Sequence, residues 1–228
     1  MNTETGKKAQ PGKARTDHAP PGAPELAAVH RGLRREARLL VALVAAAAPG
    51  DTARARVLAG HFRSYRRSLR HCLDAEESCL WPPLLARLDL DADLVLRSTE
   101  QHEHIAATLA AAAAALPAWE SGAGEADRDA LTALLAEHRA VLTGHLAEEA
   151  GLLFPLAVRH LDPYQWEALG AHLTAADLGT ALEDALPAER RALLGRLSLP
   201  ARLRWYAAGR LRYARRAGAV RRAPRPAP

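Results

Sequence analysis

Apolar residues recur every three or four positions along four long stretches of the chain, which is the pattern of an amphipathic helix. Proline and glycine residues separate these stretches. The first two are divided at Pro49-Gly50, the second ends or kinks at Pro82-Pro83, and the last two are divided by a loop expected over residues 117–126. Because short connections make successive long helices run antiparallel, the pattern predicts an up-down-up-down four-helix bundle.

The composition also favours helix. Of the 228 residues, 49% are hydrophobic, and alanine and leucine dominate this set, with little valine, isoleucine or aromatic residue. Residues 1–24 are rich in Gly, Pro and Lys and lack an apolar run, so we expect a disordered arm that is neither a signal peptide nor an anchor. We therefore divide this all-α chain into the arm, a bundle over residues 25–160, and short C-terminal helices with an Arg-rich tail over residues 161–228. The apolar runs are too short for a transmembrane segment.

The positive net charge belongs to one end of the chain. The whole sequence carries +5, but residues 200–228 contain nine arginines and no acid, so residues 1–199 are net negative. Such a tail either binds nucleic acid or an anionic membrane, or is simply a solvated or disordered end. The basic charge therefore says little about the predicted bundle.

The two cysteines, Cys72 and Cys79, lie seven residues apart in one predicted helix. They are two turns from each other and cannot form an intramolecular disulfide. A chain without a disulfide framework is typical of a reducing compartment, so we expect a cytoplasmic protein.

Two halves of the predicted bundle repeat each other at an offset of 72 or 73 residues. In each half a histidine is followed by a helix in which two polar residues, four apart, precede a proline. The matching positions are His30 with His102, Cys72 with His145, Glu76 with Glu149, and Pro82 with Pro155. Self-similarity at a fixed offset marks a repeated supersecondary unit, which here is a helical hairpin present twice.

The repeated polar residues lie on the apolar stripes of their helices, where burying them costs several kcal/mol unless they are paired or bound to metal. At a rise of ~1.5 Å per residue, antiparallel packing brings all of them to the same end of the core. His145 and Glu149 are four residues apart and can grip a common centre. A nitrogen and oxygen ligand set suits iron, manganese or zinc, and two carboxylates related by the repeat could bridge two ions. The other explanation is a hydrogen-bonded polar core without metal.

Four segments, in this order, resemble the hemerythrin-like (HHE cation-binding) family over about residues 25–160: VHRGLRRE, HCLDAEESCLWP, EQHEHI and HLAEEAGLLFP. The resemblance implies a four-helix bundle that holds non-haem iron, often two ions with oxygen and carboxylate bridges. It further implies binding of dioxygen or another small diatomic ligand, or a response to oxygen, iron or redox state. By matching motifs, the implied ligands are His30, Glu76, His102, His145 and Glu149, with the two glutamates as bridges.

One position departs from the family pattern. Four residues before Glu76, where relatives usually have histidine, this chain has Cys72, and the neighbouring imidazole is His71. Three explanations stay open: His71 reaches the metal, Cys72 binds as a thiolate, or this half of the site is weakened. A further histidine that oxygen carriers place near the third-helix ligand is also missing, since Ser98 and Ala106 stand there.

Other polar residues near these motifs have simpler interpretations. We expect His61, Tyr65 and His138 to be hydrogen-bonded core residues or to contact the ligands, and Glu77 and Glu148 to form a solvated face. For function, the leading hypothesis is a non-enzymatic iron protein for oxygen, redox or iron sensing or binding. The alternatives are a di-iron oxidase or peroxidase-like enzyme, and a metal-depleted helical interaction module with a basic tail.

Overall fold

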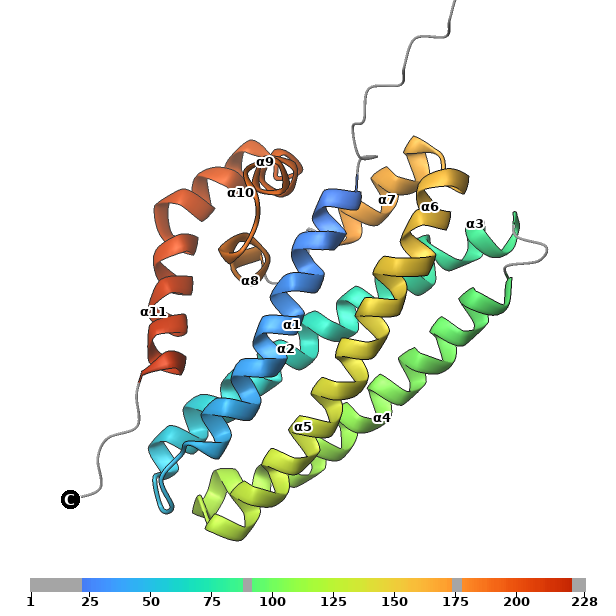
Figure 1. Cartoon of the computed structure of the whole chain (residues 1–228). Helices are drawn as coiled ribbons and strands as arrows, with labels where there is room; N and C mark the ends of the chain where they lie inside the picture. The colour runs from blue at the N-terminus through green and yellow to red at the C-terminus, as the bar shows by residue number, and fades with distance from the viewer. Residues whose placement is uncertain (1–21, 88–91, 174–177, 223–228) are drawn as a thin grey trace, which may run out of the picture.

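The computed structural model describes residues 22–87, 92–173 and 178–222, and within these ranges it contains helices and no strand (Figure 1). The all-α class expected from the sequence is confirmed. The disordered arm expected over residues 1–24 lies outside the described residues as far as residue 21, and the helix α1 already begins at Ala23. Residues 223–228 of the basic tail also lie outside them.

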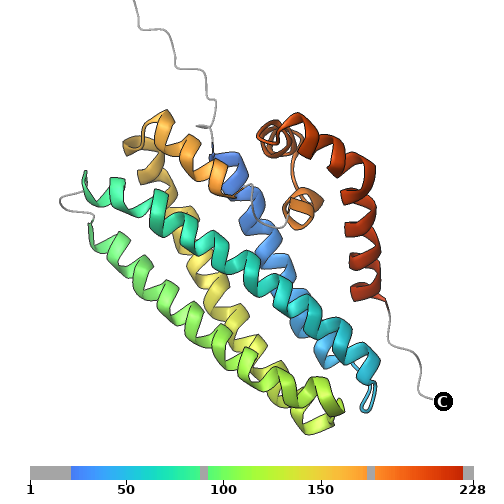
Figure 2. The same ribbon diagram turned by 180° about the vertical axis from the view of Figure 1, so that it is seen from behind.

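Four long helices form the body of the molecule: α1 (Ala23–Ala45), α2 (Thr52–Cys79), α4 (Ala92–Gly122) and α5 (Glu125–Glu148). They lie side by side in both views, and each packs against two of the others (Figures 1 and 2). Helix α1 contacts α2 and α5, and α4 contacts the same two helices. The buried faces carry the leucine and alanine stripes seen in the sequence, so the arrangement is consistent with a helical bundle.

The loop expected over residues 117–126 is wrong. Helix α4 continues through Pro117 to Gly122, and α5 begins at Glu125. An interior proline costs about 3 kcal/mol, but Trp119 is 1% exposed in the core, and losing a buried tryptophan costs about 3–5 kcal/mol. Burial of Trp119 therefore outweighs the proline. The short turn that remains is tied to the α1–α2 turn, because the Gly50 amide donates to the Ala123 carbonyl at 2.9 Å.

At the other end of the bundle, prolines interrupt two of the helices. Helix α2 ends at Cys79 and is followed by the short α3 (Trp81–Leu85), which contains Pro82-Pro83. Helix α5 passes into a π-helical turn, η1 (Glu149–Leu153), and then into α6 (Phe154–His160). In that turn the Phe154 amide donates to the Glu149 carbonyl, five residues back. Such π-turns are frequent at functional sites, and this one begins at a predicted ligand.

The C-terminal third wraps one side of the bundle with α7 (Pro163–Leu173), α8 (Leu178–Glu183), α9 (Pro187–Gly195), α10 (Leu199–Arg204), η2 (Trp205–Gly209) and α11 (Arg210–Arg221). Helices α7, α8 and α9 contact α1, and α11 contacts α2 (Figure 1). The described part of the Arg-rich tail is therefore a docked helix. Val220 is buried there, and Arg221 pairs with Glu183. These two anchors explain why this part of the tail is not an irregular solvated end.

One continuous helical run, residues 125–160, is long and apolar enough to cross a membrane by length and composition alone. The same run packs against α1 and α4 and turns His138, His145 and Glu149 into the protein interior. Core helices of other proteins pass the same test, so the run is weak evidence for a membrane span.

Candidate metal centre

The five ligands implied by the motifs lie in one cluster at the end of the bundle that carries α3 and α6. His30 comes from α1, Glu76 from α2, His102 from α4, His145 from α5 and Glu149 from η1. Four of them are buried, at 3% exposure or less, and only the His30 side chain, at 12%, reaches solvent. Residues separated by as many as 119 positions along the chain thus meet at the depth that the helical repeat predicts.

Each carboxylate of the cluster lies between histidines from two different helices. One Glu76 oxygen, Oε1, is 3.0 Å from Nε2 of His30, and the other, Oε2, is 3.2 Å from Nε2 of His102. Glu149 Oε2 is 3.7 Å from Nδ1 of His30 and also 3.7 Å from Nε2 of His145. Each carboxylate therefore lies where it could bridge between histidines of different helices.

The outer nitrogens of two histidines are fixed by hydrogen bonds, which leaves their inner nitrogens for the cluster. His102 donates from Nδ1 to Glu77 Oε1 at 2.8 Å. Because a carboxylate can only accept, Nδ1 of His102 carries a proton, and Nε2 is the nitrogen left to face Glu76. Metal-binding histidines are oriented in this way by a carboxylate or carbonyl on their other nitrogen.

The tautomer of His145 follows from a chain of contacts on the outside of the bundle. Glu148 accepts from the amide nitrogen of Gln101 at 2.6 Å, so the amide oxygen of Gln101 must point the other way. That oxygen lies 2.8 Å from Nδ1 of His145, which therefore donates. Nε2 of His145 is left with its lone pair toward the interior. Arg97 completes the chain by donating to Glu148 at 3.2 Å.

Several buried polar atoms of the cluster have no hydrogen-bond partner in the described part of the chain. They are Oε2 of Glu76, Nε2 of His102, Nε2 of His145, and both carboxylate oxygens of Glu149. Unpaired buried polar groups are rare in folded proteins because each costs about 1–3 kcal/mol. Here all of them are potential ligand atoms, and those of Glu76, His102 and His145 lie within 4.8 Å of one another. The residues present fit bound cations, which would pair with such atoms.

The acid–base balance of the cluster shows the same need for positive charge. Burial works against the Glu76 carboxylate, but its close contacts with the His102 and His30 imidazoles outweigh burial and hold the pKa of Glu76 below its usual value. Burial, reinforced by the charge of Glu76, raises the pKa of Glu149. Burial lowers the pKa of His145 to about 4, so this imidazole is neutral at pH 7. Protons thus balance the carboxylates wherever a metal cation does not.

Cys72 and His71 are separated by the fold. The buried Cys72 thiol donates to Glu76 Oε1 at 3.2 Å, and Cys72, His30 and Glu76 offer ligand atoms that all lie within 4.8 Å of one another. His71 points to α7 instead, where its Nε2 donates to the His172 carbonyl at 2.7 Å. The structure therefore brings Cys72 into the cluster and leaves His71 outside it.

Sequence reasoning missed the residues that orient the ligands. Glu77 and Glu148 were expected on a solvated face. Glu77 instead accepts a hydrogen bond from His102, and Glu148 is connected to His145 through Gln101. Their position directly beside Glu76, Glu149 and His102 in the sequence was the available signal. Residues next to a ligand on one helix can face the ligand of the neighbouring helix.

A second polar network lies deeper in the bundle. Tyr65 and His138 Nε2 are 2.7 Å apart, and Nδ1 of His138 is 3.0 Å from the Thr108 hydroxyl. Burial lowers the pKa of His138 to about 4, so its imidazole is neutral. His61 pairs with Glu36 at 2.9 Å. Tyr65 and His138 thus have the hydrogen-bonded core roles that the sequence suggested, whereas the half-buried His61 forms an ion pair with Glu36.

Comparison with known proteins supports the same interpretation of the helices. No curated protein and no solved structure gives a significant match. The family model of the hemerythrin HHE cation binding domain matches residues 22–157. The match extends from α1 into α6 and covers more than half of the 228 residues. The chain therefore belongs to the hemerythrin HHE cation-binding domain family.

Proposed function

We propose that the cluster binds a pair of non-haem iron ions and that the protein uses them to bind or sense dioxygen, another small diatomic ligand, or redox state. The observation that carries the proposal is the set of buried histidine and carboxylate atoms left without partners. Nitrogen and oxygen ligands in this proportion suit iron, with manganese or zinc as further candidates. The family membership, a domain type defined by cation binding, supports the same conclusion.

Two overlapping ligand groups support two ions. His30, Cys72 and Glu76 form one group, and Glu76, His102 and His145 form the other. They share Glu76, whose two oxygens face different groups, and Glu149 lies between His30 and His145. In this proposal Glu76 and Glu149 would be shared by the two ions, and the three histidines and Cys72 would provide the other ligands.

The protein residues position the ions and control access to them. Glu77 and Gln101 hold the rings of His102 and His145 so that Nε2 faces the centre. Bound iron would supply open coordination positions and a reversible change of oxidation state. Entry is proposed on the side of His30, the most exposed ligand of the cluster.

The proposal also includes the finer points predicted from the sequence. We take the four long helices to alternate in direction, and we place the protein in the cytoplasm, where its two free cysteines would stay reduced. We favour a binding or sensing role over an oxidase or peroxidase. Ferritin-like di-iron proteins use Glu-x-x-His motifs with additional Glu residues, whereas this chain offers the reversed order and two central carboxylates.

Metal analysis of the purified chain tests the proposal directly. We expect about two iron ions per chain and an optical spectrum that changes between air and reducing conditions. Glu149→Ala should release metal, and the matched change Glu137→Ala, at an exposed position on α5, should not. Turnover with peroxide would favour the enzyme, and a chain without metal after iron reconstitution would overturn the proposal in favour of an interaction module.

A further inference from the structure

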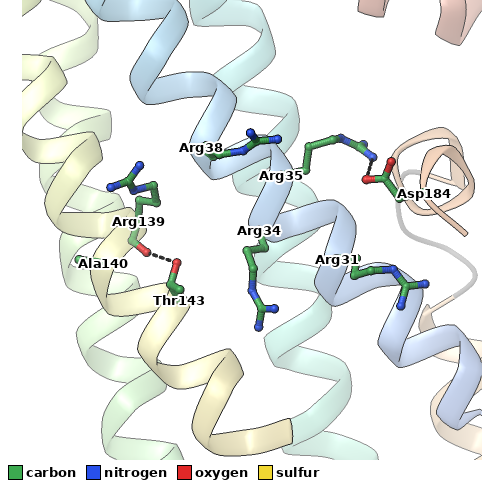
Figure 3. A pocket seen from close by; sticks show the side chains of 8 residues that line it. All are labelled: Arg31, Arg34, Arg35, Arg38, Arg139, Ala140, Thr143 and Asp184. Atoms are coloured by element: carbon green, nitrogen blue, oxygen red, sulfur yellow. Dashed lines mark hydrogen bonds and ion pairs between the residues drawn. The ribbon is translucent and has the colours of Figure 1, made fainter.

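A groove between α1 and α5 is lined by positive charge. It has a volume of about 590 Å³, and its walls contain five arginines and one aspartate (Figure 3). The lining residues are Arg31, Arg34, Arg35, Arg38, Arg139, Ala140, Thr143 and Asp184. Binding pockets for small molecules commonly have volumes of about 300–1,000 Å³. The size of the groove is therefore that of a small-molecule site.

Four of the arginines form a stripe along one face of α1, at spacings of three and four residues. Like charges at these spacings repel each other and destabilise a helix. Two of the four have a structural explanation. Arg31 pairs with Glu189, and Arg35 pairs with Asp184 at 2.5 Å and with Glu36 at 2.7 Å. These two side chains fasten the C-terminal helices to α1.

The remaining arginines are exposed side chains without such a role. Within the described residues, Arg34, Arg38 and Arg139 make no ion pair or side-chain hydrogen bond, and no dashed line reaches their guanidinium groups in Figure 3. Arg34 and Arg38 are one turn apart on α1, and Arg139 lies on α5 across the groove. Ala140 and Thr143 complete this wall, and the Thr143 hydroxyl donates to the Arg139 carbonyl at 2.7 Å.

We propose that this groove binds a small molecule that carries two or more phosphate groups. A guanidinium group forms paired, charge-assisted hydrogen bonds with phosphate oxygens. Three unpaired guanidinium groups carry more positive charge than a ligand with one carboxylate would balance. We take the ligand to be a small molecule because the arginines line a hollow of that size between two helices. This site goes beyond the proposed function, since it contains none of the metal-cluster residues.

Calorimetric titration of the full-length protein with inorganic pyrophosphate tests the proposal at about 0.15 M salt, where weak surface attraction is screened. We expect saturable binding of one pyrophosphate per chain. The double variant Arg34→Gln/Arg38→Gln should weaken it by at least about tenfold, because each charge-assisted contact is worth roughly that factor. Arg139→Gln, on the opposite wall, should weaken it in the same way.

The matched control is Arg67→Gln/Arg70→Gln, which removes the same charge from exposed positions on α2. This variant should bind pyrophosphate within about twofold of the wild type. Equal weakening in the control, or no saturable binding to the wild type, would overturn the site. Tighter binding of duplex DNA, lost in the same groove variants, would assign the groove to nucleic acid and overturn the small-molecule proposal. Unchanged metal content and circular dichroism in every variant separate these outcomes from misfolding and from failure of the metal proposal.

Discussion

The substitution Glu149→Gln should have opposite effects on the metal-free and the metal-loaded protein. Glutamine keeps the size of the side chain and removes its charge. Glu149 is 1% exposed, and neither of its carboxylate oxygens has a hydrogen-bond partner in the described part of the chain, so without a cation the carboxylate would be buried and unpaired. The substituted side chain would be neutral, and its amide could donate to the lone pair of His145 Nε2. The variant therefore relieves an unfavourable group when no cation is present.

The size of the gain follows from the cost of a buried, unpaired group, about 1–3 kcal/mol. For a chain of this length, that corresponds to a rise in Tm of about 2–4 °C per kcal/mol. The gain depends on pH because burial raises the pKa of Glu149 above its unfolded value. Its proton stabilises the wild-type fold below the unfolded pKa, and this stabilisation is lost as the pH rises through the folded pKa. Glu149→Gln should therefore help most at alkaline pH.

In the loaded protein the same change removes a bridging ligand. Changing residues that merely orient ligands costs about 10–100-fold in metal affinity, so loss of a bridge should cost at least about 100-fold. Where the metal was present at about 100 times its Kd, the protein loses most of the roughly 2.7 kcal/mol of ligand-linked stability. The loaded variant should thus unfold at a lower temperature than loaded wild type.

Thermal unfolding with and without chelator, at about pH 6 and about pH 9, on either side of the raised pKa of Glu149, measures both effects. Glu137→Gln makes the same chemical change at an exposed position on α5 and should alter neither Tm. A variant that is destabilised equally with and without metal would refute the reasoning, since a purely structural carboxylate would behave in that way. A variant that retains metal would refute the bridging role.

Three further outcomes are expected. Gln101→Leu removes the acceptor for Nδ1 of His145 and should lower metal affinity by about 10–100-fold with the helical circular dichroism unchanged, as chelator competition would report. Hydrogen bonding to Arg221 lowers the pKa of Glu183 to about 2, so the contact stabilises the folded chain above the unfolded pKa and is lost as the pH falls from about 4.5 toward 2. Hydrogen-exchange protection factors in α11, which divide out the intrinsic pH dependence of amide exchange, should fall over that range, and in Arg221→Gln they should be low at every pH. Tyr65→Phe removes a buried hydroxyl from its imidazole partner and should cost about 1–3 kcal/mol in urea unfolding without changing metal content.

Each of these outcomes can fail in a recognisable way. Normal metal affinity in Gln101→Leu would mean that the ring of His145 is held by packing alone. Protection factors in α11 that do not change with pH would mean that Val220 and its apolar contacts, and not the ion pair, dock the helix. Metal loss in Tyr65→Phe would extend the centre deeper into the bundle than its ligand atoms suggest.

The sequence by itself determined the helical class, the approximate extent of the four long helices, and the five residues that meet in the cluster. Periodicity was sufficient because a helix has a fixed rise, so residues at matching distances from the helix ends arrive at the same depth. The repeat between His30 and His102, and between Glu76 and Glu149, carried this information without any knowledge of the packing.

Only the tertiary structure decided which neighbours serve the cluster and where each helix ends. Glu77 and Gln101 orient ligands that belong to other parts of the chain, and such contacts depend on how helices are rotated against each other. His71 and Cys72 are adjacent in sequence, yet a helix rotates by about 100° per residue, so only one of them faces the cluster. Helix α4 passes through Pro117 because Trp119 is buried in the core, a gain that no local propensity contains. Local sequence patterns predict the helices, and the free energy of side-chain packing decides where a helix continues against those patterns.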